Sequence, residues 1–290
     1  MDEALDVGGD EEGSRGLDTL EVAGLKLRGV TRGGVETCLM VPTLGVMFDI
    51  GMCPPGALKF NKALVSHGHA DHLGGLAYLV SQRGLMRAPP IEVHLPEEVV
   101  PPMRQILAAW SAIEGFNYQA DVVGHAPGSR VRVARDVEAV ALRTTHRVPS
   151  IGWLLERTTH KLRAEYVGRP PQELARLRAS GEAITEASTA PLLCVTGDTQ
   201  IEFFDAHEQV RRCKVLVHEV TSWDDRRDVA QTRRWGHTHV DEIVARAEQF
   251  TGEALVLVHR SMRHTRREAE AVVRARFPAA VRDRVHVFGG

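Results

Sequence analysis

Residues 67–75 read His-Gly-His-Ala-Asp-His-Leu-Gly-Gly, which places four potential metal ligands within six consecutive positions directly after a short apolar run. Imidazole and carboxylate groups together are ligands that suit zinc. His67 and His69 are two residues apart, so on an extended loop their side chains project to the same side. Asp71 and His72 follow as the chain enters a helix, so they can face a second metal beside the first. A solvated histidine-rich loop is the alternative, but ionisable groups cluster this densely mainly at functional sites.

Composition limits the classes of protein that this chain can belong to. Its 290 residues, 43% of them hydrophobic, are enough to bury a substantial core. A formal net charge of -2 excludes a globally basic nucleic-acid binder, so any polyanion must meet a local basic patch. Aromatic residues make up only 5%, which does not indicate a surface built on base stacking.

The cysteines and the N-terminal segment bear on location. Cys38, Cys53, Cys194 and Cys213 form no Cys-x-x-Cys pair and are too few to staple a chain of this length, so we expect reduced thiols. Residues 1–20 are acidic and glycine-rich, which predicts a disordered tail rather than a secretory signal. No apolar run is long enough to cross a membrane. We therefore expect a cytoplasmic protein.

From residue 21 to 290 short strands alternate with helices, which predicts a single domain with a layered α/β sandwich. An excursion at about 157–189, with a Pro-Pro break and a short helical patch, interrupts this pattern. The expected strands are Leu25–Val30, Glu36–Val41, Leu44–Ile50, Lys62–Ser66, a hairpin over Val131–Leu142, Ile151–Leu155, Leu192–Thr196, Val215–His218, Ala254–Val258 and Val285–Phe288. The expected helices are Leu73–Arg83, Glu97–Glu114, Ala206–Cys213, Asp241–Phe250 and Arg266–Arg276.

The H-x-H-x-D-H-x-G-G pattern of residues 67–75 resembles the metallo-β-lactamase superfamily. That resemblance implies an α/β fold, the αββα four-layer sandwich, with a dinuclear metal site at the sheet edge. It also implies that later strand ends supply further ligands, which match His146, Asp198 and His259. The implied sets are His67, His69 and His146 for one metal and Asp71, His72 and His259 for the other, with Asp198 bridging them and Asp49 orienting the loop from behind.

Over Val22 to about Arg263 the chain resembles short-form tRNase Z, the endonuclease that processes the 3′ end of precursor tRNA. The resemblance is carried by 34–38 (Gly-Val-Glu-Thr-Cys), 48–51 (Phe-Asp-Ile-Gly), 66–75, 146–153, 196–199 (Thr-Gly-Asp-Thr), 218–221 (His-Glu-Val-Thr) and 236–239 (Gly-His-Thr-His). The last two are the discriminating elements. They imply that Glu219 and His237 form a proton-donating pair. Asp71, a ligand in the metal-binding motif, is also expected to be required for catalysis. His239 competes with His237 for the donor role.

The chain also departs from that family. Trp153 stands where a tyrosine is usual, and the segment around His259 differs from the common pattern. The tRNA-gripping arm of longer relatives has no clear copy, and only Arg157–Arg178 occupies its place, as either a substrate-contacting segment or an ordinary surface excursion. Because its basic residues outnumber its acidic ones, we predict that it contacts substrate. The candidate substrate contacts are Arg163, Arg176, Arg178 and Ser150.

The implied activity is cleavage of the 3′ trailer of precursor tRNA by a metal-activated hydroxide, with two zinc ions or another divalent metal such as manganese. The implied assembly is a homodimer in which each arm serves the other subunit's site. Three alternatives remain at this stage: a hydrolase of a small ester, lactone or nucleotide phosphodiester, an RNA-binding protein with vestigial catalysis, and an iron-loaded redox protein. Diiron relatives usually carry a carboxylate at the position of His69, which favours zinc.

Overall fold

A computed structural model describes residues 16–289 of the chain. The acidic tail predicted for residues 1–20 lies largely outside this range, but its predicted boundary is wrong. Strand β1 (Asp18–Val22) pairs antiparallel with β2 (Leu25–Arg32). The Asp18 carboxylate accepts hydrogen bonds from the Gly289 amide and the Arg266 guanidinium, both at 2.8 Å, so the last residues of the predicted tail are tied to the C-terminal end of the chain.

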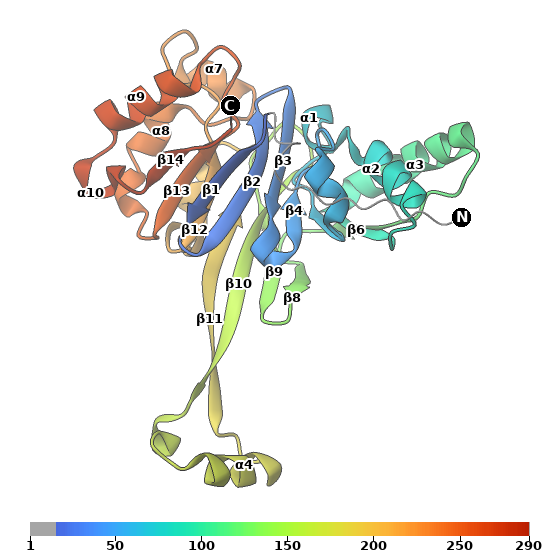
Figure 1. Ribbon diagram of the computed structural model, residues 1–290. Coiled ribbons are helices and arrows are strands. Elements are labelled where there is room, and N and C mark those ends of the chain that lie inside the picture. The colour runs from blue at the N-terminus through green and yellow to red at the C-terminus, as the bar shows by residue number, and fades with distance from the viewer. Residues whose placement is uncertain (1–15, 290) are drawn as a thin grey trace.

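Two seven-stranded mixed sheets pack face to face, with the element order shown in Figure 1. The first sheet has the order β1 to β7, in which the further strands are β3 (Glu36–Val41), β4 (Val46–Phe48), β5 (Lys62–Leu64), β6 (Ile91–Pro96) and β7 (Ala120–His125). The second has the order β14 to β8, comprising β8 (Arg130–Ala134), β9 (Val137–Arg143), β10 (Ile151–Leu162), β11 (Thr185–Val195), β12 (Val215–Glu219), β13 (Ala254–Val258) and β14 (Val285–Val287). The core between the sheets includes Leu27, Phe48 and Trp153, all at most 1% exposed.

Helices cover the outer face of each sheet, which confirms the four-layer αββα fold. The first sheet is covered by α1 (Ala70–Leu73), α2 (Leu76–Leu85) and α3 (Val100–Glu114). Around the second lie α5 (Glu202–Ala206), α6 (Glu208–Arg211), α7 (Val229–Arg234), α8 (Val240–Val244), α9 (Arg266–Arg276) and α10 (Ala279–Arg282). Short 3-10 turns are η1 (Pro42–Leu44), η2 (Pro55–Lys59), η3 (Glu97–Val99), η4 (Ala164–Tyr166) and η5 (Ala247–Gln249). None of the helices in the described range is long and apolar enough to span a bilayer.

The segment that follows the metal-binding motif differs from the single helix predicted over Leu73–Arg83. It forms two helices, α1 and α2, because the chain turns at Gly74 and Gly75 to pack against the end of β4. The Gly75 amide donates to the Ile50 carbonyl at 2.8 Å, and a Cβ at Gly75 would lie 2.9 Å from the Met52 carbonyl carbon. Only glycine fits this contact, so the glycine pair fixes the motif loop to the sheet.

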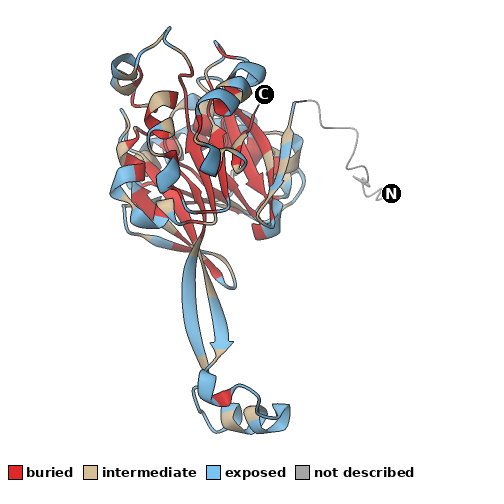
Figure 2. Cartoon of the chain, turned by 90° about the vertical axis from the view of Figure 1, so that its left-hand side faces the viewer, coloured by how far each residue is buried: buried red, intermediate tan, exposed pale blue. Residues whose placement is uncertain are grey.

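The excursion predicted at about 157–189 is a two-stranded arm that projects from the sandwich (Figures 1 and 2). Strands β10 and β11 continue beyond the predicted Ile151–Leu155 and Leu192–Thr196, and from Thr158↔Thr189 to Leu162↔Thr185 they pair only with each other. Helix α4 (Pro171–Ala179) lies at the tip, where Tyr166 and Ile184 are buried. The arm is therefore a regular hairpin with a capped end, and the sequence pattern did not predict its strands.

Candidate active site

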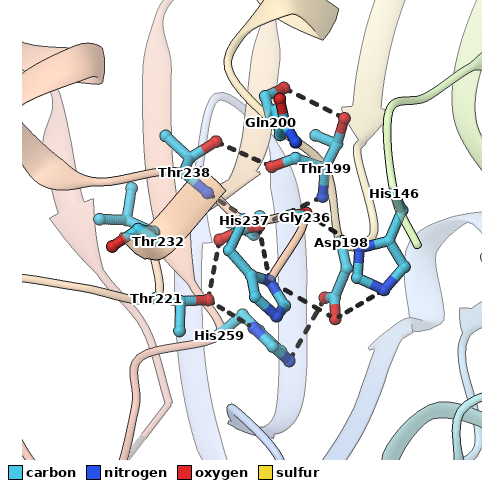
Figure 3. A network of polar contacts seen from close by, with 12 residues as sticks. His146, Asp198, Thr199, Gln200, Thr221, Thr232, Gly236, His237, Thr238 and His259 are labelled. Carbon is cyan, nitrogen blue, oxygen red and sulfur yellow. Dashed lines mark hydrogen bonds and ion pairs between the residues drawn. The ribbon is translucent and has the colours of Figure 1, made fainter. Parts of the chain in front are cut away.

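Most of the site residues implied by the sequence lie where strands end at one edge of the sandwich. His146 follows β9, Asp198 follows β11, Glu219 ends β12 and His259 follows β13. These strands run in the same direction, so their carboxyl ends meet at one edge. The motif loop that begins at His67 follows β5 in the facing sheet. With Asp49 after β4 and His237 between α7 and α8, the fold gathers residues from seven segments of the chain, several of which appear in Figure 3.

The first group of ligand atoms consists of three ring nitrogens and one carboxylate oxygen. His69 Nδ1 lies 3.0 Å from His67 Nε2 and 3.3 Å from His146 Nε2. Asp198 Oδ2 lies 3.7 Å from His67 Nε2 and 4.0 Å from His146 Nε2. The four ligand atoms lie within 4.8 Å of one another, as expected for atoms that converge on one ion.

The second group lies on the other side of Asp198. His72 Nε2 and His259 Nε2 are 3.2 Å apart, and Asp71 Oδ2 lies 3.6 Å from each of them. Asp198 Oδ1 lies 3.3 Å from the same two nitrogens. Asp198 therefore presents one oxygen to each group, which is the arrangement of a bridging carboxylate.

Both groups fit divalent metal ions by the chemistry of their donors. Ring nitrogens that face one another at about 3 Å cannot all be satisfied by hydrogen bonds, since neutral imidazole has only one N–H. Asp198 Oδ1 is buried and accepts no hydrogen bond from any residue between 16 and 289. Nitrogen and carboxylate donors in this ratio suit zinc and similar metals. A bound metal ion would satisfy both the buried Asp198 Oδ1 and the converging lone pairs of the histidine nitrogens.

Asp49 holds the motif loop in place from the end of β4. Its carboxylate accepts hydrogen bonds from the Ser66 amide at 2.7 Å, the Ser66 hydroxyl at 3.0 Å and His72 Nδ1 at 2.8 Å. His67 Nδ1 lies 2.9 Å from the same hydroxyl. These partners occupy the Nδ1 positions, so each of the two histidines presents Nε2 to the site. Asp49 also has a φ of 57°, a strained value for a residue other than glycine.

Two further contacts orient the ligands that come from late strands. His146 Nδ1 donates to the Gly236 carbonyl at 2.9 Å, and His259 Nδ1 lies 3.0 Å from the Thr221 hydroxyl. A Cβ at Gly236 would lie 2.7 Å from His146 Nδ1, so this close approach requires glycine. His259 has a φ of 61°, which places a second strained residue at the site. Thr221 and Ser66 therefore orient ligand side chains. Both residues belong to the quoted sequence motifs, but the sequence analysis gave neither of them a role.

His237 and Glu219 form an ion pair beside the two groups. Glu219 is fully buried, and its Oε1 lies 3.0 Å from His237 Nδ1. The same oxygen accepts from the Thr199 and Thr238 amides, while Thr221 donates to Oε2 at 3.0 Å. Burial lowers the pKa of His237, but the neighbouring carboxylates, Glu219 above all, outweigh it and raise the pKa to about 9. His237 is therefore protonated at neutral pH, with Nε2 free of hydrogen bonds to the described residues.

His239 lies outside the site. It is 1% exposed and forms the N-cap of α8, where Nδ1 accepts from the Asp241 amide at 3.2 Å and Nε2 faces the Asp224 carbonyl at 3.2 Å. Both ring nitrogens are therefore used by local structure. Of the two histidines in the Gly-His-Thr-His element, only His237 reaches Glu219.

The predicted substrate contacts fall into two separate places. Ser150 lies next to the site, because it bridges to His67 in an isolated β contact and its hydroxyl is 2.5 Å from that of Thr144. Arg163, Arg176 and Arg178 lie at the tip of the arm, at the opposite end of β10 and β11. The sequence patterns did not predict the pocket of about 420 Å³ whose lining includes His237, His259 and Trp235. Its only sequence signal is a tryptophan directly before the Gly-His-Thr-His element.

Comparison with known proteins identifies the family to which this chain is related. Residues 55–168 match the family described as the β-lactamase superfamily domain. The protein tRNase Z TRZ1 of Arabidopsis thaliana is 33% identical over 258 residues, which cover 88% of this chain and 92% of that protein.

Solved structures share the fold at low identity. YhfI of Bacillus subtilis, a metallo-β-lactamase fold protein, has a TM-score of 0.60 at 13% identity and covers 90% of this chain and 95% of its own. The short form of human tRNase Z has a TM-score of 0.52 at 17% identity and covers 86% of this chain and 94% of its own. These two show the fold, and the Arabidopsis relative shows the family. The chain therefore belongs to the tRNase Z family of the β-lactamase superfamily.

Proposed function

We propose that this protein is a zinc-dependent endoribonuclease that removes the 3′ trailer from precursor tRNA. Family membership supports a metal-dependent hydrolase that acts on RNA phosphodiesters. The observation that carries the finer proposal is the His237–Glu219 pair at 3.0 Å beside two sets of converging metal ligands. A protonated imidazole is needed when the leaving group is a poor one, such as a ribose 3′ oxygen, and contributes little to an activated ester.

The proposed assignments follow the two groups. His67, His69 and His146 would hold one zinc, and Asp71, His72 and His259 the other, with Asp198 between them. When bound, two such ions lower the pKa of water and stabilise negative charge on an attacked phosphate. Manganese is the alternative metal.

The chain's own groups perform the remaining tasks. His237 Nε2 makes no hydrogen bond to any described residue. It would give its proton to the leaving 3′ oxygen at the discriminator-proximal phosphodiester. Glu219 keeps the ring charged and in one orientation, because its Oε1 is already held by two backbone amides. Asp49 keeps His72 and the motif loop aligned. Ser150, adjacent to His67, is a proposed contact to the substrate.

We further propose a homodimer in which the arm of one chain serves the site of the other. The site lies where β10 begins at Ile151 and the arm tip lies beyond its end at Leu162, so the strand alone separates them by roughly 37 Å. An arm at the far end cannot reach its own site. Exposed apolar side chains on α2 and α3, Leu85 at 69% and Ile113 at 71%, offer a surface for a second copy. A light-scattering mass equal to one 32.0 kDa chain would contradict this proposal.

The decisive experiment is a cleavage assay with a precursor tRNA, run in parallel with a nitrophenyl phosphodiester and a lactone panel on the zinc-loaded protein. We expect cleavage that leaves a 3′ hydroxyl on the tRNA. Hydrolysis of the small substrates without RNA cleavage would support a small-molecule hydrolase instead, and RNA binding without cleavage would support vestigial catalysis. Elemental analysis showing iron in place of zinc would favour the redox class. A cytoplasmic location remains a prediction.

A further inference from the structure

The pocket of about 420 Å³ lies beside the candidate active site and shares His237 and His259 with it. Its wall includes Trp235, Met262 and Val35, whose side chains are exposed by 50%, 60% and 49%. Most large apolar side chains of the described residues fill three buried clusters, whereas these three stay exposed directly beside the candidate metal site. The pocket therefore has the walls of a binding subsite.

Trp235 differs from the buried tryptophans of this chain. Trp153 and Trp223 are at most 2% exposed, and each donates its indole N–H to a backbone carbonyl. Trp235 ends helix α7 at the C-cap, is half exposed, and its indole makes no hydrogen bond to any residue in the range 16–289. The ring contributes little to the core, and its exposed part lines the same pocket as His237.

Positive charge surrounds this ring. Arg227 and Arg263 line the pocket, and the guanidinium carbon of Arg147 lies 4.7 Å from the centroid of the Trp235 ring. None of these three arginines forms an ion pair with a carboxylate in the described chain, although many other arginines do. Guanidinium groups without ion pairs beside a half-exposed aromatic ring are the combination that binds single-stranded nucleic acid, in which bases stack and phosphates are neutralised.

We propose that this pocket holds the nucleotide whose 3′ oxygen is the leaving group, with its base stacked on Trp235 and its backbone beside Arg227 and Arg263. The assignment rests on the proposed function. It follows from position, because His237 lines the same pocket and would protonate an oxygen of the nucleotide that occupies it. Stacking depends on the face of a base and not on its edges, so the subsite accepts any of the four bases.

The test couples one side chain to one base. Precursor tRNA is prepared intact, with an abasic ribose at the nucleotide 5′ of the cleavage site, and with an abasic ribose at the nucleotide 3′ of it. On intact RNA we expect Trp235→Leu to lower kcat/KM about 10- to 100-fold, while Trp235→Phe, which keeps an aromatic face, stays within about threefold of the wild type. On the 5′ abasic RNA the Trp235→Leu effect should disappear. On the 3′ abasic RNA it should persist.

Other outcomes overturn specific parts of the proposal. An equal loss for Trp235→Leu on all three RNAs, with zinc content unchanged, would mean that Trp235 does not stack on a base. A loss that disappears only on the 3′ abasic RNA would assign the pocket to the trailer. If the wild type cleaves none of the RNAs but hydrolyses a small phosphodiester, the proposed function itself has failed, and the inference fails with it for that separate reason.

A second measurement tests the arginines with a matched control. Arg227→Gln should reduce the slope of log affinity for RNA against log salt concentration by up to about 0.7, the value for one phosphate contact on a single strand. Arg234→Gln removes an equal charge from an exposed position on α7 that does not line the pocket, and it should leave the slope unchanged. Equal effects of the two variants would show that only overall charge is sensed and would contradict a phosphate contact by Arg227.

Discussion

The two ends of the long strands β10 and β11 differ in how their residues are held. At the site end, Ile151 and Val195 lie among buried residues, and the loops beyond them carry His146 and Asp198. At the arm end the strands pair only with each other and most residues are exposed (Figure 2). One pair of strands thus connects a rigid, buried polar network to an exposed basic tip.

The difference also appears in the charges. At the site, each charge has partners at 2.7–4.0 Å, and burial makes each lost partner costly. At the arm tip, Arg163, Arg176 and Arg178 are exposed and form no ion pair within residues 16–289. Salt therefore screens their charges, and replacing them should change the stability of the fold little. Substitutions at the two ends should therefore affect different steps: chemistry at one and binding at the other.

The largest effect is expected from Asp71→Ala. This change removes a ligand atom that lies 3.6 Å from both His72 Nε2 and His259 Nε2, and it should lower hydrolysis of RNA and of a nitrophenyl phosphodiester alike, by about 1,000-fold or more. The fold should persist, because the core between the sheets is apolar. Elemental analysis should give two zinc ions per wild-type chain and fewer for the variant. Near-full activity would mean that the second metal is wrongly assigned.

His237→Ala should separate the two substrates. We expect RNA cleavage to fall about 100- to 10,000-fold, since the leaving 3′ oxygen loses its proton donor, whereas the nitrophenyl ester is largely spared. Zinc content should not change. The control is His239→Ala, which removes a helix cap and should cost about 1 kcal/mol of stability with a much smaller effect on cleavage. A selective loss in the control variant instead would place the donor two residues later.

The pH dependence of RNA cleavage should report the His237–Glu219 pair. Because the protonated ring is the active form and its pKa is about 9, cleavage should fall about tenfold per unit as pH rises beyond that value. Glu219→Gln should lower the pH at which the cleavage rate begins to fall toward 6.5, the usual histidine pKa. The same raised pKa stabilises the fold below about 6.5, a contribution lost as pH rises through 9. If the cleavage rate of Glu219→Gln falls at the same pH as that of the wild type, the pairing is disproved.

At the arm end, replacing Arg163, Arg176 and Arg178 together by glutamine should weaken tRNA binding about ten- to a hundredfold. It should lower the slope of log affinity against log salt by up to about 2.7, since three phosphate contacts would be lost. Hydrolysis of the nitrophenyl ester should barely change. A matched variant that replaces the exposed Arg212, Arg267 and Arg274, outside the arm, serves as the control. Equal losses on both substrates would point to misfolding.

The smallest effect tests whether the two ends cooperate across subunits. Chains with the arm variant are mixed with Asp71→Ala chains and allowed to exchange. If each arm serves its partner's site, mixed dimers contain one intact site with one intact arm, and activity on tRNA should recover to about a quarter of the wild type. If each arm served its own site, or if the protein were monomeric, mixing would restore nothing.

The structure confirms the predicted fold class but changes several elements. The side chains that converge at the candidate metal site were predictable because most lie in one short loop and the others follow strongly apolar strands such as Ala254–Val258. Strands β6 and β7 and the outer part of β10 were not predicted. The outer part of β10 carries polar residues with no apolar alternation, so nothing in its pattern distinguished a strand from a surface loop. Pairing with β11, a contact distant in sequence, makes it a strand.

The sequence by itself determined which residue types could bind metal and the order in which they occur along the chain, because ligand chemistry and strand ends are local properties. The tertiary structure alone decided between His237 and His239, since the choice depends on which ring reaches Glu219 and which caps a helix. It also placed Trp235 beside the site and the arm at the far end. These facts depend on how distant segments pack, and packing geometry is not encoded in any single stretch of the chain.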